Sequence, residues 1–152
     1  MEITYQVETL EESKDSVDLL KANYKELEMH QDKMTFNPDY NLFKEIEKKG
    51  GLHIVTARKD KQLIGYFVTF ISVDIHRKDH KMATNDLLYV TPLHRLSGTA
   101  REMVIFAMED LKRLGVSAIR AHTTIAHDIS KFLESKDLGF KKIGYIHEKL
   151  LI

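Results

Sequence analysis

One stretch in the second half of the chain restricts the possible folds more than any other. An extended run ends at Pro92, a short loop carries Arg95 and Gly98, and helical spacing of apolar side chains follows at 100–114. A further buried run comes at 117–124. This pattern predicts a strand–helix–strand unit, in which a helical crossover returns the chain to a neighbouring parallel strand.

The rest of the chain supplies mainly antiparallel strands and short helices. Alternating or β-branched residues predict strands at 3–7, 52–58, 63–73 and 83–91, and a last strand from Gly139 to about Leu150. Helices are predicted at 17–27, at 40–46 with Asn37-Pro38 as the N-cap, and after Asp128; the charged segment 74–81 is expected to be a loop. The order β-α-α-β-β-β-α-β-α-β predicts one α/β domain over residues 1–152, with an α+β mixed sheet.

Composition narrows the functional class. The 152 residues hold 23 basic and 23 acidic side chains, and this zero net charge argues against a nucleic-acid-binding protein. The absence of Cys rules out disulfides, thiol nucleophiles and thiolate zinc sites. No leader pattern is visible, and the longest apolar stretch, 63–73, is too short to cross a bilayer. We therefore expect a cytoplasmic protein with no membrane partner.

The loop before the long helix has the properties of an anion site. Backbone N–H groups at a helix N-terminus attract anions, and Gly98 lets a ligand approach the backbone closely. Arg95 adds a fixed positive charge, and a pyrophosphate would suit the loop. A Walker loop is excluded because no Gly-Lys-Ser/Thr follows, and one Gly is too few for a dinucleotide fingerprint. The plain alternative is a turn before an ordinary core helix.

Arg95-x-x-Gly98-x-Ala100 resembles the Arg/Gln-x-x-Gly-x-Gly/Ala signature of the GNAT superfamily of N-acetyltransferases. Val90-x-Pro92 before it, Leu138-Gly139-Phe140 near the C-terminus and the order of elements agree with this resemblance. A narrower resemblance is to the small GNAT proteins of tailed bacteriophages. It is carried by Asn37-Pro38-Asp39, Thr56-Ala57-Arg58, Ile64-Gly65-Tyr66 and Asp86-Leu87-Leu88-Tyr89-Val90.

The resemblance implies acetyl-CoA as the acetyl donor. The pyrophosphate would be held by the loop residues Leu93, His94, Arg95, Leu96, Ser97, Gly98, Thr99 and Ala100. The strand residues Leu88, Tyr89 and Val90 would pair with pantetheine, as in β-strand addition. The sheet is expected to splay between this strand and the strand at 118–122, and a backbone N–H near Tyr89 or Val90 would stabilise the oxyanion.

Two residues are candidates for proton transfer. Asp86 could accept a proton from a primary amine, whose pKa is about 10.4, although a surface or ion-paired Asp is the alternative. Many members of the superfamily place a Tyr, as general acid, where this chain has Leu133. His122 and Thr123 are candidates to replace it, but a strand-end histidine with a structural role is the simpler interpretation of His122.

Two histidines four residues apart, His76 and His80, carry letters that suit a metal, but their expected loop setting and the lack of a third ligand predict no metal site. The leading hypothesis is direct transfer of acetyl to a primary amine, on a small molecule or a peptide. The alternative is a non-catalytic CoA-binding or structural module, of phage origin. Because the chain has room for one strand after Gly139 and ends in Leu150, Leu151 and Ile152, we also expect a homodimer that completes its sheet across the interface.

Overall fold

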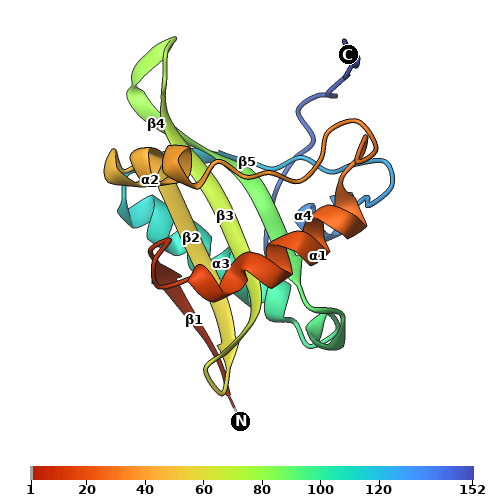
Figure 1. Cartoon of the computed structure of the whole chain (residues 1–152). Helices are drawn as coiled ribbons and strands as arrows, with labels where there is room; N and C mark the ends of the chain where they lie inside the picture. The colour runs from red at the N-terminus through yellow and green to blue at the C-terminus, as the bar shows by residue number, and fades with distance from the viewer. Residues whose placement is uncertain (1) are drawn as a thin grey trace.

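The structure, a computed structural model that describes residues 2–152, is built on a mixed β-sheet (Figure 1). Its strands are β1 (Ile3–Glu8), β2 (Leu52–Lys59), β3 (Gln62–Asp74), β4 (Arg77–Val90) and β5 (Val116–Arg120). They lie in the order β1-β2-β3-β4-β5, antiparallel except for the parallel pair β4 and β5. The predicted α+β mixed sheet with a parallel strand–helix–strand unit is confirmed.

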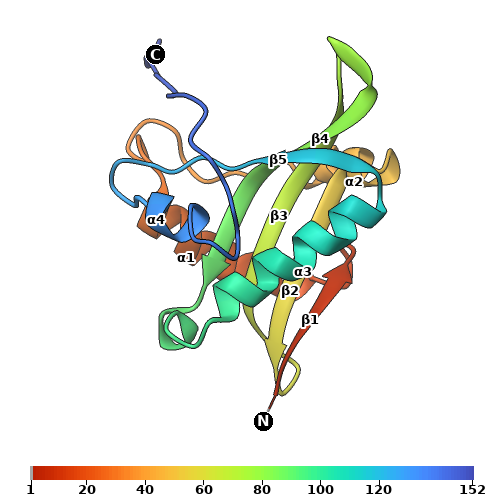
Figure 2. The same ribbon diagram turned by 180° about the vertical axis from the view of Figure 1, so that it is seen from behind.

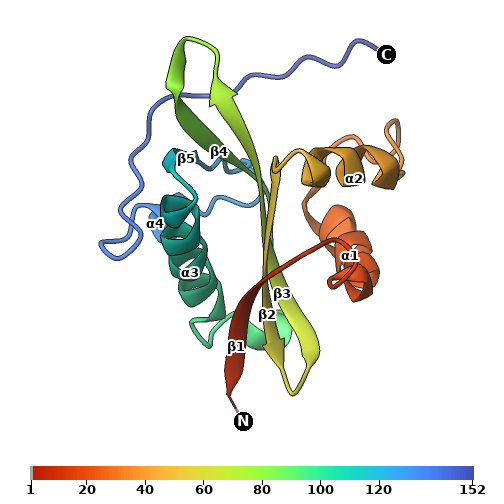
Figure 3. The ribbon, with the colours of Figure 1, turned by 90° about the vertical axis from the view of Figure 1, so that its left-hand side faces the viewer.

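Helices cover both faces of the sheet. They are α1 (Val17–Leu27), α2 (Tyr40–Lys48), α3 (Thr99–Arg113) and α4 (Ser130–Leu133). Figure 3 shows α1 and α2 on one face and α3 and α4 on the other. Successive strand residues point to opposite faces, so Ile54 packs in the core beneath α1 with Tyr66, while Val55 packs against Met103 and Val104 of α3. This alternation produces two separate hydrophobic clusters.

The helix α2 starts at Tyr40 as predicted, but its N-cap lies two residues after Asn37. Asp39 is the N-cap, and its carboxylate accepts a hydrogen bond of 2.9 Å from the N–H of Leu42. The expected cap at Asn37-Pro38 is therefore wrong, because the side chain that satisfies the first-turn N–H belongs to Asp39.

The segment 74–81, expected to be a loop, is mostly strand. β3 and β4 continue as a ribbon, with Val73 paired to Lys81 and Asp74 to Arg77. The Asp74 carboxylate closes the turn by accepting hydrogen bonds from the N–H of His76 at 2.9 Å and from Nε of Arg77 at 2.8 Å. Charged residues are compatible with this ribbon because it projects beyond the core and is exposed, so charge alone was a poor indicator of a loop.

The expected last strand is absent from the described residues. After α4 the chain has no helix or strand, and residues 141–152, here called the C-terminal tail, extend away from the body (Figure 2). A strand forms only where another backbone lies alongside to share its ladder, and β5 pairs with β4 alone in the described chain. The alternation of apolar and other residues around Ile143 and Tyr145 suits a strand, but no strand among residues 2–152 pairs with this segment.

Candidate functional site

A cleft opens where β4 and β5 separate. Lys81–Thr84 pair with Val116–Arg120, and no ladder between these strands continues toward Val90 in residues 2–152. Figures 1 and 2 show β5 running aside from β4. A cavity of about 420 Å³ lies here, bounded by the end of α1, residues 85–90 of β4, the segment after β5 and α4. The expected splay of the sheet is present.

Asp86 occupies a β-bulge on the cleft wall. Asn85 pairs with Thr69 and Leu87 with Val68, so Asp86 is the extra residue between two ladder pairs. A bulge redirects the side chain it carries, and Asp86 lines the cavity. Although solvent reaches it through the cleft, partial burial raises the pKa of Asp86 above its ordinary 3.8; the negative charge of Glu28 raises it further and His122 counteracts part of the rise.

His122 lies beyond the end of β5, in the segment that forms the opposite wall of the cleft. At the position where a general-acid Tyr was expected, the side chain of Leu133 is buried, while its neighbour Phe132 lines the cavity. His122 therefore shares the cavity with Asp86 from the β5 side, and its role as a proton donor stays a prediction. The same segment adds Thr123, Thr124 and His127 to the lining.

The loop from Leu93 to Ala100 leads directly into α3. Pro92–His94 form a 3₁₀ turn, and Gly98 is the helix N-cap with a left-handed φ of 81°. No side chain caps the helix, and the space where a Gly98 Cβ would point holds no atom within 4 Å among the described residues. Ser97 Oγ bonds to Thr99 Oγ1 at 2.6 Å, and Leu93 and Leu96 are fully solvent-facing. First-turn N–H groups are thus open to a ligand.

Arg95 is held against the cleft wall. Its Nε donates to the Val90 carbonyl at 2.9 Å, a terminal nitrogen donates to Glu26 at 2.8 Å, and the guanidinium lies 5.3 Å from the centre of the Tyr89 ring. The hydrogen bond from Arg95 lowers the pKa of the Glu26 carboxyl. The side chain therefore ties the loop to β4 and α1, and the free positive charge expected from the sequence is neutralised by Glu26.

Sequence reasoning missed the contribution of α1 to the cleft. Glu26 lies on the exposed face of α1 in its last turn, Glu28 follows the last residue of α1, and both side chains line the cavity. Neither belongs to a recognisable motif, and β4 lies some sixty positions further along the chain. Only the packing of α1 across the sheet brings these carboxylates to Asp86.

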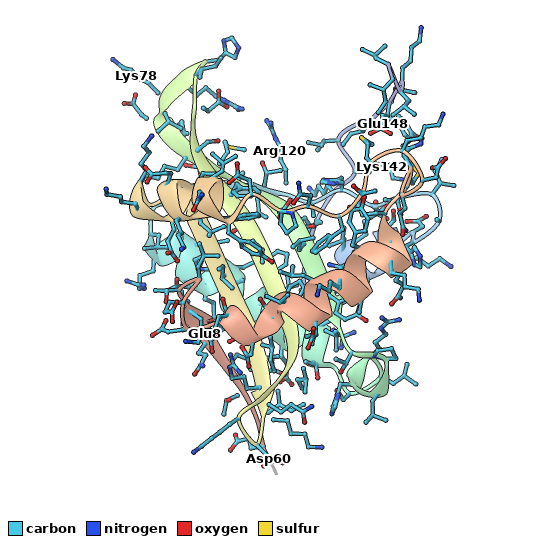
Figure 4. All side chains as sticks on the ribbon, viewed as in Figure 1. Glu8, Asp60, Lys78, Arg120, Lys142 and Glu148 are labelled. Atoms are coloured by element: carbon cyan, nitrogen blue, oxygen red, sulfur yellow. The ribbon has the colours of Figure 1, made fainter. Side chains whose placement is uncertain are left out.

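A second, wider hollow lies at the other end of the sheet. It has a volume of about 750 Å³ and is lined by Glu8, Asp15 and Arg58 among others. Figure 4 shows Glu8 far from Arg120, which marks the cleft end of β5. Its charges bind one another, since Arg58 bridges Glu8 and Asp15, each at 2.7 Å. In residues 2–152, no three His, Asp or Glu side chains are grouped as metal ligands would be.

Comparison with protein families identifies the chain. Residues 15–140, well over half of its length, match the model of the acetyltransferase (GNAT) family. The chain belongs to the GNAT family of acetyltransferases. The mixed sheet with its parallel pair β4 and β5 is a GNAT-like fold, and the resemblance inferred from Arg95, Gly98 and Ala100 is confirmed at the level of the family.

Solved GNAT structures share the whole fold with this chain. An aminoglycoside acetyltransferase from an uncultured soil metagenomic sample has a TM-score of 0.77 at 14% identity, covering 100% of this chain and 99% of its own. Glucosamine-6-phosphate N-acetyltransferase from Arabidopsis thaliana has 0.74 at 14%, covering 100% of each. Ribosomal-protein-alanine N-acetyltransferase from Brucella melitensis biovar Abortus 2308 has 0.71 at 13%, covering 97% and 99%. At such identities the likeness shows the fold alone.

No curated protein sequence matches the chain. The narrower resemblance to phage-encoded GNAT proteins finds no support in these comparisons and stays a prediction. Within residues 2–152, no helix has the length and apolar character needed to cross a membrane.

Proposed function

We propose that the protein is an acetyl-CoA-dependent N-acetyltransferase that passes the acetyl group directly to a primary amine. The observation that carries this proposal is the placement of Asp86 on a bulge, inside the cleft that opens between β4 and β5. The chain can bring a base to the same place where a thioester and an amine would meet.

The residues present suit acetyl-CoA, which supplies an activated acetyl thioester when bound. The uncapped N-terminus of α3 and the open space at Gly98 support a pyrophosphate at Leu93–Ala100. Beyond Thr84, β4 keeps its ladder with β3 but has none with β5, so one edge of Leu88–Val90 is available to pantetheine amides. The side chain of Arg95 would hold this loop in place, with its charge shared with Glu26.

Asp86 would accept the proton that the amine must lose before it attacks. Its pKa is raised above 3.8, which makes it a better base than an ordinary carboxylate. A backbone N–H near Tyr89 or Val90 would donate to the carbonyl oxygen as that oxygen gains charge. Leu133 can supply no proton to the departing thiolate, so His122 is the proposed donor, although a thiol with a pKa of about 8.5 leaves tolerably without one.

A second candidate function is that of a non-catalytic CoA-binding or structural module. The observation that favours it is Leu133, an apolar and buried side chain at the position where a general acid was expected. The structural relatives do not decide the acceptor, because their names give three different ones: an aminoglycoside, glucosamine 6-phosphate and a ribosomal-protein alanine.

One experiment in two stages separates these functions. Thermal denaturation with and without acetyl-CoA reports binding, and release of the CoA thiol in the presence of a panel of amines reports transfer. We expect stabilisation by acetyl-CoA and thiol release that requires an amine, with the acetylated amine found by mass spectrometry. Stabilisation without amine-dependent release would favour the binding module, and the absence of both would reject the two candidates together.

A further inference from the structure

The cleft holds more negative than positive side chains. Among residues 2–152, its carboxylates are Glu26, Glu28 and Asp86, its one arginine is Arg95, and no lysine lines it. Arg95 is already paired with Glu26 at 2.8 Å. Within residues 2–152, the Glu28 and Asp86 carboxylates take part in no ion pair, so the cleft has two uncompensated negative charges.

These two carboxylates approach the cavity from different elements. Asp86 projects from the bulge of β4, and Glu28 follows the C-terminal end of α1. They are near enough that the negative charge of Glu28 contributes to the raised pKa of Asp86. Two like charges that share a cavity repel one another, and a cation placed between them relieves that repulsion.

Two histidines near the cleft already have hydrogen-bond partners. The His127 ring bonds to the Glu26 carbonyl at 3.0 Å, and the His30 ring pairs with Glu148 at 2.9 Å. Glu148 itself lies on the C-terminal tail, beside the loop that follows α1 (Figure 4), and brings a further carboxylate to this side of the molecule. The remaining histidine, His122, lines the same cavity as Asp86 and counteracts part of the rise in the pKa of Asp86.

We propose, on the basis of the function proposed above, that the acceptor is a diamine or polyamine, whose reacting amine lies beside Asp86 and whose second ammonium group pairs with Glu28. Each positive group of such an acceptor meets a carboxylate that has no other partner. An acceptor that carries a phosphate or carboxylate would bring its charge next to Glu28 and Asp86, while Arg95 is already paired with Glu26.

Acceptors that differ only in the charge of the far end test this assignment. Putrescine, n-butylamine and γ-aminobutyrate share a four-carbon chain and end in a cation, a methyl group and an anion; spermidine extends the reach. We expect kcat/KM, measured by CoA release at low salt, to be about tenfold higher for putrescine or spermidine than for butylamine, and lowest for γ-aminobutyrate; a tenfold ratio corresponds to about 1.4 kcal/mol for the contact with the far ammonium group. Added salt should narrow the difference.

The variant Glu28→Gln should reduce the ratio of diamine to monoamine kcat/KM to about one. Its control is Glu45→Gln, which removes an exposed carboxylate from α2, outside the cavity, and should keep the ratio. Equal kcat/KM for butylamine and the diamines, or a ratio that survives Glu28→Gln, would overturn the inference while leaving the transferase in place. Failure of every amine, with no stabilisation by acetyl-CoA, would overturn the transferase proposal as well.

Discussion

Gly98 occupies the most critical backbone position of the proposed CoA loop. Its φ of 81° is left-handed, and the direction of its missing Cβ is open. In Gly98→Glu the new carboxylate would stand at the N-terminus of α3, where the pyrophosphate is expected. We predict that acetyl-CoA binding weakens by roughly 10- to 100-fold, the value of one or two lost charge-assisted contacts, as measured by isothermal titration calorimetry.

The matched control for this change is Gly115→Glu. Gly115 has a φ of 83° and equally open space, but it lies past the C-terminal end of α3. Both variants carry the same backbone strain of about 1–2 kcal/mol. Because the helix dipole disfavours a carboxylate at the C-terminal end, thermal stability should fall somewhat more in Gly115→Glu. Affinity for acetyl-CoA should fall only in Gly98→Glu, and equal affinities in the two variants would remove the loop as the pyrophosphate site.

Asp86 is the residue on which the proposed chemistry depends. We predict that Asp86→Asn lowers kcat by roughly 10²–10⁴-fold near neutral pH, where the free amine is protonated and needs a base. The deficit should shrink toward pH 10, because the amine loses its proton to solvent there. In the unmodified enzyme, activity should fall as the pH drops through the raised pKa of Asp86, and this acid limb should be missing in the variant. Superimposable pH–rate profiles would exclude Asp86 as the base.

At the scale of elements, Arg58 fastens β1 and the turn after it to β2. Its guanidinium donates to Glu8 at 2.7 and 3.0 Å and to Asp15 at 2.7 and 2.9 Å. The Glu8 side chain is only 4% exposed, so Arg58→Met would leave a carboxylate without its partner in a nearly dry site. We predict a loss of about 3–5 kcal/mol in the free energy of unfolding at neutral pH.

The pH dependence of this loss has a definite sign. Burial alone would raise the pKa of Glu8, but the hydrogen bonds from Arg58, Gln6 and Thr56 and the charge of Arg58 together outweigh it and hold the pKa below its ordinary 4.5. The stabilisation is therefore complete above pH 4.5 and is lost as the pH falls through the lower pKa of the folded state. In Arg58→Met, Glu8 loses its charged partner and keeps its burial and the weaker hydrogen bonds from Gln6 and Thr56, so the gap in stability between the two proteins should narrow in acid. Urea unfolding followed by circular dichroism measures it; a constant gap would contradict this account.

Elements with a strong local period were the ones that sequence could predict. The spacing of apolar residues predicted α3, and runs of β-branched residues predicted β2 and β3. The predicted bounds of these elements agree with the structure within a few residues. The β3–β4 ribbon and the C-terminal tail were predicted wrongly because a strand depends on its neighbour. Arg77 and Lys81 gain ladder partners from β3 although they are charged, and residues 141–152 have no ladder partner among residues 2–152 although their apolar side chains alternate.

At the scale of the whole molecule, the C-terminal tail has a composition that a solvated segment does not need. Ile143, Tyr145, Ile146, Leu151 and Ile152 are 78–86% exposed, and β5 has an unpaired edge in the described chain. The tail of a second copy could pair with that edge, and burial would contribute roughly 25 cal/mol per Å² of apolar surface. We therefore predict a homodimer, seen by sedimentation equilibrium, which weakens when Leu150–Ile152 are deleted.

Two results would contradict this prediction. A monomer at tens of micromolar would exclude the dimer itself. A truncated chain that dimerises as strongly as the full chain would place the contact elsewhere. Acetyl-CoA binding gives the control, because the loop at Leu93–Ala100 lies far from the deleted residues in sequence and should keep its affinity.

The site as a whole was only partly predictable. Leu93–Ala100 and Asp86 could be found because each lies in a local pattern: a strand end, a glycine at a helix start, and an acidic residue within an apolar strand. Glu26 and Glu28 could not be found, because the position of α1 across the sheet depends on tertiary packing. The same packing brings Glu26 to Arg95, and no pattern in the sequence predicts this ion pair.

The central claim is that acetyl-CoA lies in this cleft, with its thioester beside Asp86. The electron density of a crystal grown with acetyl-CoA tests it most directly. We predict density for the pyrophosphate against the backbone of Leu93–Ala100, for pantetheine along Leu88–Val90, and for the acetyl group in the opening between β4 and β5. Density for acetyl-CoA at any other surface, with this cleft filled only by water, would contradict the account.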